Sequence, residues 1–141
     1  MNNTLTPFHL AIPVDDISKA RDFYGVTLNL PEGRSDTSWQ DYDLFGHQLV
    51  IHQVADYKIM RFFNPVDDHA VPLPHFGVVL KWEDFNSLAE RLKKDQIEFV
   101  IEPYIRFKDQ PGEQATMFFY DPAGNALEFK AFKDMSKLFA T

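Results

Sequence analysis

The stretch Phe119–Glu128, with the sequence FYDPAGNALE, decides the fold of this chain. Its centre, Asp121–Asn125, combines Asp, Pro, Gly and Asn, the residue types that form tight turns. Apolar runs on either side predict two strands, Ala115–Tyr120 and Ala126–Phe132. Within the second strand Glu128 stands between two apolar neighbours, and an unpaired buried charge is costly. This carboxylate therefore either faces solvent or is compensated, and a metal ion would compensate it if the strand lines a cavity.

The rest of the chain repeats the pattern of elements around this stretch. Phe8–Val14 (FHLAIPV) opens a first half, and His75–Leu80 (HFGVVL) opens a second. Leu49–Val54 closes the first half, as Ala126–Phe132 closes the second. One amphipathic helix follows the first strand of each half, so that both halves have the order β-α-β-β-β. The sequence therefore predicts an α+β fold of two βαβββ modules.

Apolar residues at helical spacing locate the two helices. The first is predicted over about Ile17–Leu28, with Asp15 or Asp16 as its N-cap. The second is predicted to start from a cap at Glu83 or Asp84 and to end at about Gln96. The predicted apolar faces are Ile17, Ala20, Phe23 and Tyr24 on the first helix and Phe85, Leu88, Ala89 and Leu92 on the second. The other predicted segments are strands at 39–45, 75–81 and 97–101, a polar loop at 105–114, module 1 at about 5–55, a Pro-rich connector at 56–73, module 2 at about 74–132, and a C-terminal tail at 133–141.

Composition limits the classes of function. At 141 residues the chain is long enough for one domain with a full hydrophobic core, and its net charge of −7 disfavours nucleic acid and anionic membranes. The absence of cysteine excludes disulfides, thiolate nucleophiles and Cys-ligated zinc. Met1–Pro7 lacks the segments of a signal peptide, and no apolar run approaches the ~20 residues that cross a bilayer. We expect a single soluble, cytoplasmic domain over residues 1–141, with a small-molecule substrate and no nucleic-acid or membrane partner.

Four residues with metal-binding side chains lie at similar places in the two halves. His9 and His75 stand in the first strand of each half, and His52 and Glu128 stand in the last. Imidazole nitrogens and a carboxylate oxygen are common ligands of divalent first-row metal ions. Counted from the turn glycine before each last strand, Val50 rather than His52 is the positional counterpart of Glu128. The pattern predicts a metal triad of His9, His75 and Glu128, with His52 as a fourth candidate ligand.

Four segments match one known family: Phe8–Asp16 (FHLAIPVDD), Ala20–Gly25 (ARDFYG), Pro74–Val79 (PHFGVV) and Phe119–Glu128. On these segments the chain resembles the vicinal oxygen chelate superfamily, which includes glyoxalase I, bleomycin-resistance proteins, fosfomycin-resistance enzymes and extradiol ring-cleaving dioxygenases. The resemblance implies that the two modules form an open, curled mixed sheet around a divalent metal ion. It also implies metal ligands in the first and last strands of each module, and a homodimer.

The ligand positions separate members of this family. Glyoxalase I has an acidic residue where His52 falls, so His52 departs from that pattern. Extradiol dioxygenases use two His and one Glu, which His9, His75 and Glu128 match. Bleomycin-resistance proteins lack the ligands, so the full set here disfavours a purely sequestering role.

Three functions stay open at this point. The first, which we favour, is a ring-cleaving dioxygenase: iron(II), held by two His and one Glu, binds a substrate with neighbouring oxygens and leaves room for O₂. The second is a glyoxalase-type isomerase or lyase, or an epoxide-opening transferase, with Ni²⁺, Zn²⁺ or Mn²⁺ as a Lewis acid. The third is a metal-free protein that binds a small molecule such as an antibiotic.

Further residues are assigned roles within these hypotheses. In the dioxygenase, His52 would act as an acid or base with Tyr120 as a helper; in the isomerase, Glu128 would act as the base. Arg106 lies in a polar loop that either closes over an anionic substrate or is simply solvated. Phe119 lies in a Phe-rich strand that either lines a pocket or packs the core. The candidate substrate contacts are Trp39, Arg106 and Phe119.

Overall fold

The structure, a computed structural model, describes residues 5–141 and divides into two compact units. The first unit is Met1–Ile59 and the second is Met60–Thr141. Residues 1–4, part of the stretch in which the sequence shows no signal peptide, lie outside the described residues. The division falls inside the predicted connector, so each unit contains one predicted module. The single domain over 1–141 stays a prediction.

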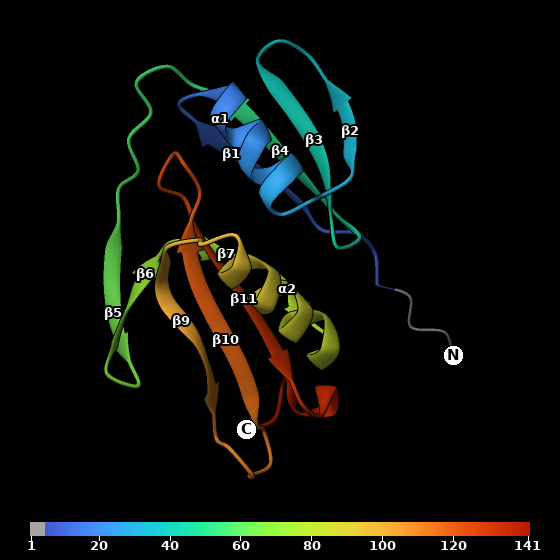
Figure 1. Ribbon diagram of the computed structural model, residues 1–141, viewed down its shortest axis with the longest axis vertical. Helices are drawn as coiled ribbons and strands as arrows, with labels where there is room; N and C mark the ends of the chain where they lie inside the picture. Colours follow the sequence, from blue (N-terminus) through green and yellow to red (C-terminus); the bar gives the residue numbers. More distant parts are fainter. Residues whose placement is uncertain (1–4) are drawn as a thin grey trace. The chain divides into compact units, whose positions relative to one another are not determined.

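The first unit is a four-stranded sheet with helical turns on one face (Figure 1). The strand order is β1-β4-β3-β2, in which β1 runs parallel to β4 and the other neighbours are antiparallel. Tyr24, Tyr42 and Leu49 are buried in the core of this unit. Its elements are β1 (His9–Val14), α1 (Ile17–Arg21), η1 (Asp22–Thr27), β2 (Glu32–Ser35), β3 (Trp39–Leu44) and β4 (His47–Gln53).

The first helix begins where the sequence predicts. Asp16 is its N-cap, and the carboxylate of Asp16 accepts a hydrogen bond from the backbone N–H of Lys19. One regular helix over Ile17–Leu28 is not observed, because α1 changes to the π-helical segment η1 at Asp22. The apolar stripe of the prediction is nevertheless confirmed, since Ile17, Ala20, Phe23 and Tyr24 are all buried.

The second unit is a larger mixed sheet that carries one long helix, together with a separate two-stranded ribbon (Figure 1). The order in the larger sheet is β7-β11-β10-β9, and β8 also pairs with β11. β7 and β8 run parallel to β11, whereas β10 is antiparallel to both of its neighbours. The elements are β5 (Phe62–Val66), β6 (His69–Leu73), β7 (His75–Phe76), β8 (Val79–Leu80), α2 (Trp82–Lys94), β9 (Phe99–Arg106), β10 (Gln114–Tyr120), β11 (Ala126–Phe132) and η2 (Met135–Lys137).

The structure confirms the predicted turn at Asp121–Asn125, which joins β10 and β11. One carboxylate oxygen of Asp121 accepts hydrogen bonds from the backbone N–H groups of Ala123 and Asn125, at 2.9 Å each. The other accepts from the Asn125 side chain, and Gly124 takes the positive φ of 90° that the turn needs. These bonds fix the register in which Glu128 of β11 lies opposite Phe118 of β10.

Helix α2 starts at Trp82, two residues earlier than a cap at Glu83 would place it and three earlier than a cap at Asp84. Its N-cap is Lys81, which makes no side-chain capping bond, so Glu83 and Asp84 lie in the first turn instead. There their negative charges interact favourably with the positive end of the helix dipole, which is a different way of stabilising the same helix end. The predicted apolar face of the helix is confirmed by the burial of Phe85, Leu88, Ala89 and Leu92.

Two strands of the second unit differ from the prediction. The strand expected at 97–101 is β9, which starts at Phe99 and continues to Arg106, so the predicted loop at 105–114 loses its first two residues. The strand expected at 75–81 breaks into β7 and β8 around Gly77. A Cβ at Gly77 would lie 1.5 Å from the backbone oxygen of Glu128, so the chain passes closer to β11 here than any other residue type allows.

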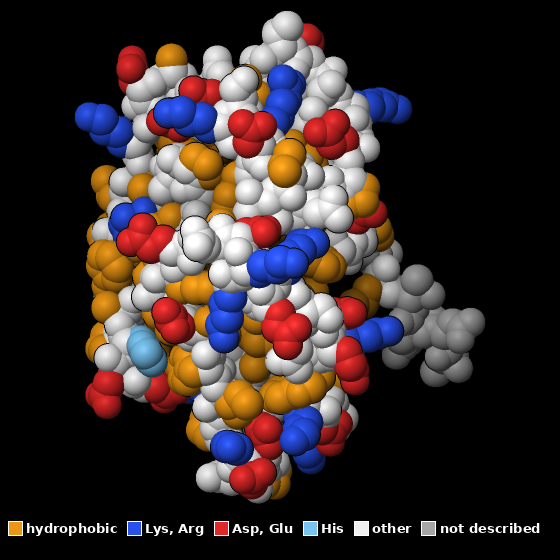
Figure 2. All heavy atoms as spheres, in the orientation of Figure 1, with side chains coloured by type: hydrophobic (Ala, Val, Ile, Leu, Met, Phe, Trp, Pro, Cys, Tyr) orange, Lys and Arg blue, Asp and Glu red, His pale blue; other side chains and the backbone are white. Residues whose placement is uncertain are grey.

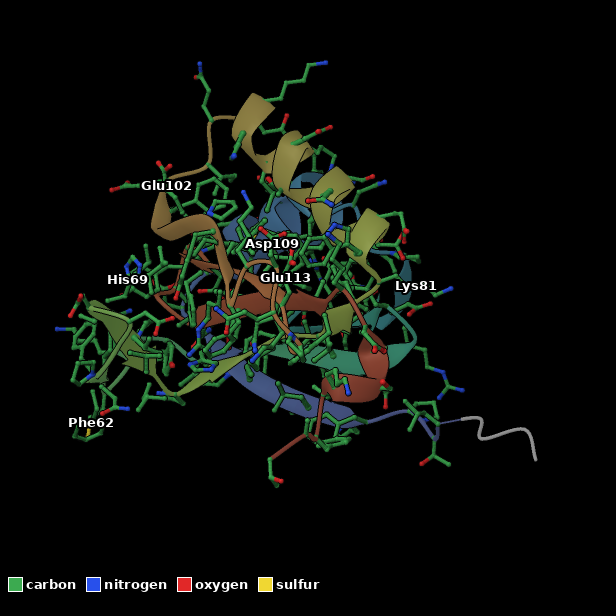
Figure 3. All side chains as sticks on the ribbon, turned by 90° about the horizontal axis from the view of Figure 1, so that it is seen from below. Phe62, His69, Lys81, Glu102, Asp109 and Glu113 are labelled. Carbon is green, nitrogen blue, oxygen red and sulfur yellow. The ribbon has the colours of Figure 1, made fainter. Side chains whose placement is uncertain are left out.

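The connector contains a ribbon, β5 and β6, that the sequence did not predict. Its strands pair antiparallel around Asp67 and Asp68, whose φ angles of 50° and 63° form a tight two-residue turn. The sequence did not predict strands here because both strands contain proline, which is rare in strands away from the edge of a sheet. Phe62 and Phe63 are 61% and 55% exposed, and Figure 2 shows hydrophobic side chains gathered on the side where β5 lies. Figure 3 labels Phe62 on β5 and His69 on β6.

Both units therefore have the βαβββ order, and their sheets are open and mixed. The α+β fold class with two βαβββ modules is confirmed. Within residues 5–141 we find no helix with the length and apolar character to span a membrane.

Candidate metal centre

The second unit brings together two of the predicted ligands, His75 and Glu128. In the parallel pair β7–β11, His75 lies opposite Ala126, and Glu128 follows two residues later on the same face of β11. His75 Nε2 lies 3.2 Å from Glu128 Oε1. Their side chains are only 23% and 15% exposed, so the pair is largely shielded from water.

Each member of this pair is anchored by a second contact on its far side. His75 Nδ1 donates to the backbone oxygen of Pro72 at 2.8 Å, which leaves Nε2 facing Glu128. The hydroxyl of Thr116, on β10, donates to Glu128 Oε2 at 2.6 Å. Phe118 meets the His75 ring edge-on, with the ring centroids 5.2 Å apart. The pair is thus oriented by a carbonyl, a hydroxyl and an aromatic ring.

Hydrogen bonding between His75 and Glu128 shifts the pKa of each residue. The hydrogen bond to Glu128 raises the pKa of His75 above its ordinary value, although burial of the imidazole opposes this shift. Burial raises the pKa of Glu128, but hydrogen bonds from His75 and Thr116 outweigh it, so that the pKa of Glu128 is lowered. Both shifts favour the charged form of each residue.

The chemistry and spacing of the pair fit a divalent metal ion. Neighbouring ligands at ~2.1 Å from one ion lie ~3.0 Å apart in octahedral and ~3.4 Å apart in tetrahedral geometry. The 3.2 Å between His75 Nε2 and Glu128 Oε1 falls between these two values. A histidine ligand usually donates its other ring N–H to a carbonyl or carboxylate, as His75 does to Pro72.

His9 and His52 belong to the first unit, and both are exposed. His9 lies on β1 opposite Gln48 of β4, and its Nδ1 is 2.8 Å from the side-chain oxygen of Gln48. His52 lies on β4 between Pro13 of β1 and Trp39 of β3. Across the part of the chain that the structure describes, no three His, Asp or Glu side chains form a metal-binding group. The ligand roles of His9 and His52 stay predictions.

The strand pairing shows which positions of the two halves correspond to each other. His9 of β1 pairs with Gln48 of β4, just as His75 of β7 pairs with Ala126 of β11. Val50 follows Gln48 by two residues, and Glu128 follows Ala126 by two residues. The pairing therefore supports the sequence count that made Val50, not His52, the counterpart of Glu128. His52 follows Gln48 by four residues and so corresponds to Lys130, which lies two residues after Glu128.

The residues assigned to catalysis (Tyr120) or to substrate binding (Trp39, Arg106 and Phe119) lie in varied surroundings. Tyr120 shares a row with Ala126 and His75 across three strands, and the guanidinium of Arg61 lies 4.0 Å from the centre of its ring. Phe119 is fully buried and stacks on Phe129, so it contributes to the core.

The other two assigned residues, Arg106 and Trp39, come from different units. Arg106 is on β9 rather than in a free loop, and it forms an ion pair with Asp67 of the ribbon turn. Trp39 is partly exposed beside His52. The roles of all four assigned residues stay predictions.

Several contacts of His75, Glu128 and His9 were not found from the sequence. Thr116 lies two residues before Phe118, the strand partner of Glu128, and so on the same face of the sheet. The register of the hairpin would therefore have predicted the contact between Thr116 and Glu128. Pro72 acts through its backbone oxygen, which carries no residue-specific signal. Gln48 required the pairing of β1 with β4, which are far apart in the sequence. In the first unit Gln48 also lines a depression of about 410 Å³ with the carboxylates of Glu32, Asp41 and Asp43.

One protein-family model matches most of the chain. The sequence model described as the Glyoxalase/Bleomycin resistance protein/Dioxygenase superfamily matches residues 6–129. The chain belongs to this superfamily. The membership covers both units and includes every predicted metal ligand. No curated protein matches the sequence significantly.

Solved structures of this superfamily resemble the chain along nearly its whole length. A glyoxalase/bleomycin resistance protein/dioxygenase from Alicyclobacillus acidocaldarius is 31% identical, with a TM-score of 0.79, and the match covers 99% of this chain and 100% of that one. The fosfomycin resistance protein FosX from Listeria monocytogenes is 22% identical, with a TM-score of 0.63 and coverage of 93% and 94%. A point mutant of FosX, 21% identical with a TM-score of 0.64 and coverage of 98% of both chains, was solved with Mn(II) and 1S,2S-dihydroxypropylphosphonic acid. The two FosX structures are evidence of the shared fold alone.

Proposed function

We propose that this superfamily member is a divalent-metal-dependent enzyme that acts on a small substrate with two neighbouring oxygens. The observation that carries the proposal is the pair of His75 Nε2 and Glu128 Oε1, 3.2 Å apart and anchored on both far sides. Anchored ligands lose little freedom when they bind an ion, which favours metal binding over a merely structural ion pair.

His9 is the third ligand in this proposal. It opens β1 as His75 opens β7, and Val50 takes the place that a second carboxylate would occupy in the first half. The set is then two imidazoles and one carboxylate. Such a set leaves coordination positions open for a chelating substrate and for a further small molecule such as O₂.

Within this set we favour a ring-cleaving dioxygenase that uses iron(II). The bound metal would supply binding of substrate and O₂ side by side and stabilisation of the charge that develops during reaction. The protein's own contribution is to hold the ligand atoms: Pro72 orients the His75 ring, and Thr116 holds the second oxygen of Glu128. Tyr120, in line with His75 across the sheet, is the candidate to exchange a proton with the substrate. The role of His52 as an acid or base belongs to the same proposal.

The second candidate is Lewis-acid chemistry of the glyoxalase or epoxide-opening type with Mn²⁺, Ni²⁺ or Zn²⁺. The Mn(II) in the structure of the FosX mutant is the observation that favours it, since that protein shares the fold over nearly its whole length. Here Glu128 would alternate between holding the metal and accepting a proton. Thr116 would keep the freed carboxylate in place.

The test starts from metal-free protein, prepared with a chelator and titrated separately with iron(II), Mn²⁺, Ni²⁺ and Zn²⁺ in a calorimeter under argon. Each metal form then receives a panel of catechols, a hemithioacetal and an epoxide with thiol or water. Oxygen uptake with a catechol in the iron form supports the dioxygenase. Turnover without oxygen in another metal form would replace it with the second candidate. Failure to bind any of the four metals would contradict both and favour a metal-free binding protein.

A pair of matched variants separates the site from general effects. Glu128→Gln removes the carboxylate ligand and keeps its size, whereas Glu90→Gln makes the same change at an exposed position of α2. Only the first variant is expected to lose metal binding. The predicted homodimer and cytoplasmic location remain separate predictions, which sedimentation and cell fractionation would test.

A further inference from the structure

His9 is hydrogen-bonded to Gln48, which is hydrogen-bonded in turn to Asp41, so that the chain of bonds crosses three neighbouring strands. His9 Nδ1 lies 2.8 Å from Gln48 Oε1, and Gln48 Nε2 lies 3.3 Å from Asp41 Oδ2. The residues come from β1, β4 and β3, which are adjacent in the sheet. His9 pairs with Gln48, and Asp41 pairs with Val50. Because Val50 is two residues after Gln48 on β4, the side chains of His9, Gln48 and Asp41 all lie on the same face of the sheet.

The chemistry of these groups determines where the proton on His9 resides. An ionised carboxylate only accepts hydrogen bonds, so Asp41 must face the NH₂ group of the Gln48 amide. The amide oxygen of Gln48 then faces His9, and this oxygen also only accepts. His9 Nδ1 must therefore carry the proton and donate it, which leaves the lone pair of the neutral ring on Nε2.

His75 donates from the same ring nitrogen, Nδ1, to a different kind of acceptor. In the second unit a backbone carbonyl, that of Pro72, accepts from Nδ1 of the histidine. In the first unit the side chain of Gln48 does so. In the first strand of each module the histidine therefore directs Nδ1 at an acceptor oxygen and leaves Nε2 on the opposite side of the ring, although the supporting groups are unrelated.

His47, in the same unit, shows that this tautomer is not a general property of the sheet. Its Nδ1 accepts a hydrogen bond from the backbone N–H of Phe8 at 2.9 Å. The neutral ring of His47 consequently carries its proton on Nε2, the opposite arrangement. His9 and His47 thus provide two opposite cases within one small sheet.

We propose that Gln48, itself oriented by Asp41, is a positioning residue that fixes His9 as the Nδ1–H tautomer and presents Nε2 as a metal ligand. The metal role in this inference rests on the proposed function. The tautomer assignment does not, because it follows from hydrogen bonds within the first unit. A ligating histidine whose outer N–H loses its acceptor commonly loses about 10–100-fold in metal affinity.

The first experiment measures the tautomer in metal-free protein by ¹⁵N–¹H correlation of the histidine rings, at about pH 8.5, about two units above the pKa of histidine in model peptides. Wild-type His9 is expected as Nδ1–H and His47 as Nε2–H. Gln48→Leu should convert His9 to Nε2–H, the form that imidazole prefers in water, whereas Gln48→Glu retains an acceptor and should keep Nδ1–H. Asp41→Asn should give a mixture, because the Gln48 amide can then turn over. A wild-type His9 in the Nε2–H form would overturn the inference.

The second experiment measures the affinity for Mn²⁺ and Zn²⁺ by calorimetry. Gln48→Leu is expected to weaken binding by about 10–100-fold, Gln48→Glu to restore it, and Gln110→Leu, at an exposed loop position, to leave it unchanged. Equal affinity of wild type and Gln48→Leu would overturn the positioning role while the proposed function stands. Wild-type protein that binds neither metal, with His9 still Nδ1–H, would overturn the proposed function and, with it, the metal role of Gln48.

Discussion

Val50 and Glu128 occupy equivalent places in the two sheets, two residues beyond the strand partners of His9 and His75. One is an apolar side chain that is 6% exposed, and the other is the carboxylate of the candidate site. The duplicated fold therefore supplies a histidine in both halves but an acid in only one. This difference is why the proposed ligand set contains a single acid.

Replacing Val50 with Glu should recreate in the first half the His–Glu pair of the second. Without metal, a carboxylate at this buried place is expected to cost about 2–4 kcal/mol, because burial of an unpaired charge is unfavourable. Added Zn²⁺ should recover more stability in this variant than in wild type, since the new carboxylate becomes a ligand. Thermal unfolding with and without Zn²⁺ measures both effects.

Val50→Gln is the control, because it introduces a polar group of the same size without the charge. It should be destabilised without any added recovery by Zn²⁺. If the Gln and Glu variants respond to Zn²⁺ equally, Val50 does not stand at a ligand position.

Replacing Thr116 with Val should weaken the hold on Glu128. The variant keeps the shape of the side chain but removes the hydroxyl that donates to Glu128 Oε2 at 2.6 Å. Leaving this buried oxygen without its donor is expected to cost about 1–3 kcal/mol of stability and about 10–100-fold in metal affinity. Thr116→Ser retains the hydroxyl and should restore most of the affinity. A Val variant that binds metal as tightly as wild type would remove Thr116 from the site.

The ion pair of His75 and Glu128 predicts how stability of the metal-free protein depends on pH. Because the pKa of Glu128 is lowered from 4.5, its contribution is present above that pH and is lost as the pH falls through the pKa in the folded protein. Because the pKa of His75 is raised from 6.5, its contribution is present below that pH and is lost as the pH rises through the folded value. Both contributions are complete between pH 4.5 and pH 6.5.

The measurement is the free energy of unfolding in urea, with a chelator present, for wild type and Glu128→Gln. The difference between the two proteins should be largest between pH 4.5 and pH 6.5 and should shrink on both sides. A difference that is constant across the whole pH range would show that the pair does not titrate on unfolding.

Gly77→Ala should be among the most destabilising single changes in the second unit. The new Cβ would lie 1.5 Å from the backbone oxygen of Glu128, an overlap that only movement of β7 or β11 can relieve. We expect a loss of at least about 3 kcal/mol together with loss of metal binding, because the same movement displaces His75 from Glu128. Gly25→Ala is the comparison, since its Cβ meets the end of the Glu32 side chain at 3.2 Å and that side chain can move. Equal unfolding midpoints for the two variants would contradict the close approach at Gly77.

Much of the fold was predictable because its signals are local. The turn at 121–125 carries its own hydrogen-bonding side chains, and the cap at Asp16 lies next to the helix that it starts. Signals that depend on partners far along the chain were not predictable. The ribbon strand β5 is stabilised by pairing with β6 despite Pro65. The change to a π-helical segment at Asp22 has no signal in the local sequence.

The candidate site divides in the same way. His75 and Glu128 were predicted as ligands because the two modules repeat, and the structure brings them together. The groups that orient the ligands were not predicted. Thr116 and Gln48 act through strand registers, and Pro72 acts through a backbone atom. A repeat in a sequence can locate ligands, whereas their support depends on the pairing of strands.

The central claim is that His75 and Glu128 bind a divalent metal ion. The most direct measurement is an anomalous difference map from crystals of wild-type protein soaked in Mn²⁺, with crystals of Glu128→Gln treated identically. We expect one strong peak about 2.2 Å from both His75 Nε2 and Glu128 Oε1 in wild type, and no such peak in the variant. A map in which the wild-type pair keeps its direct contact and manganese binds elsewhere, or nowhere, would contradict it.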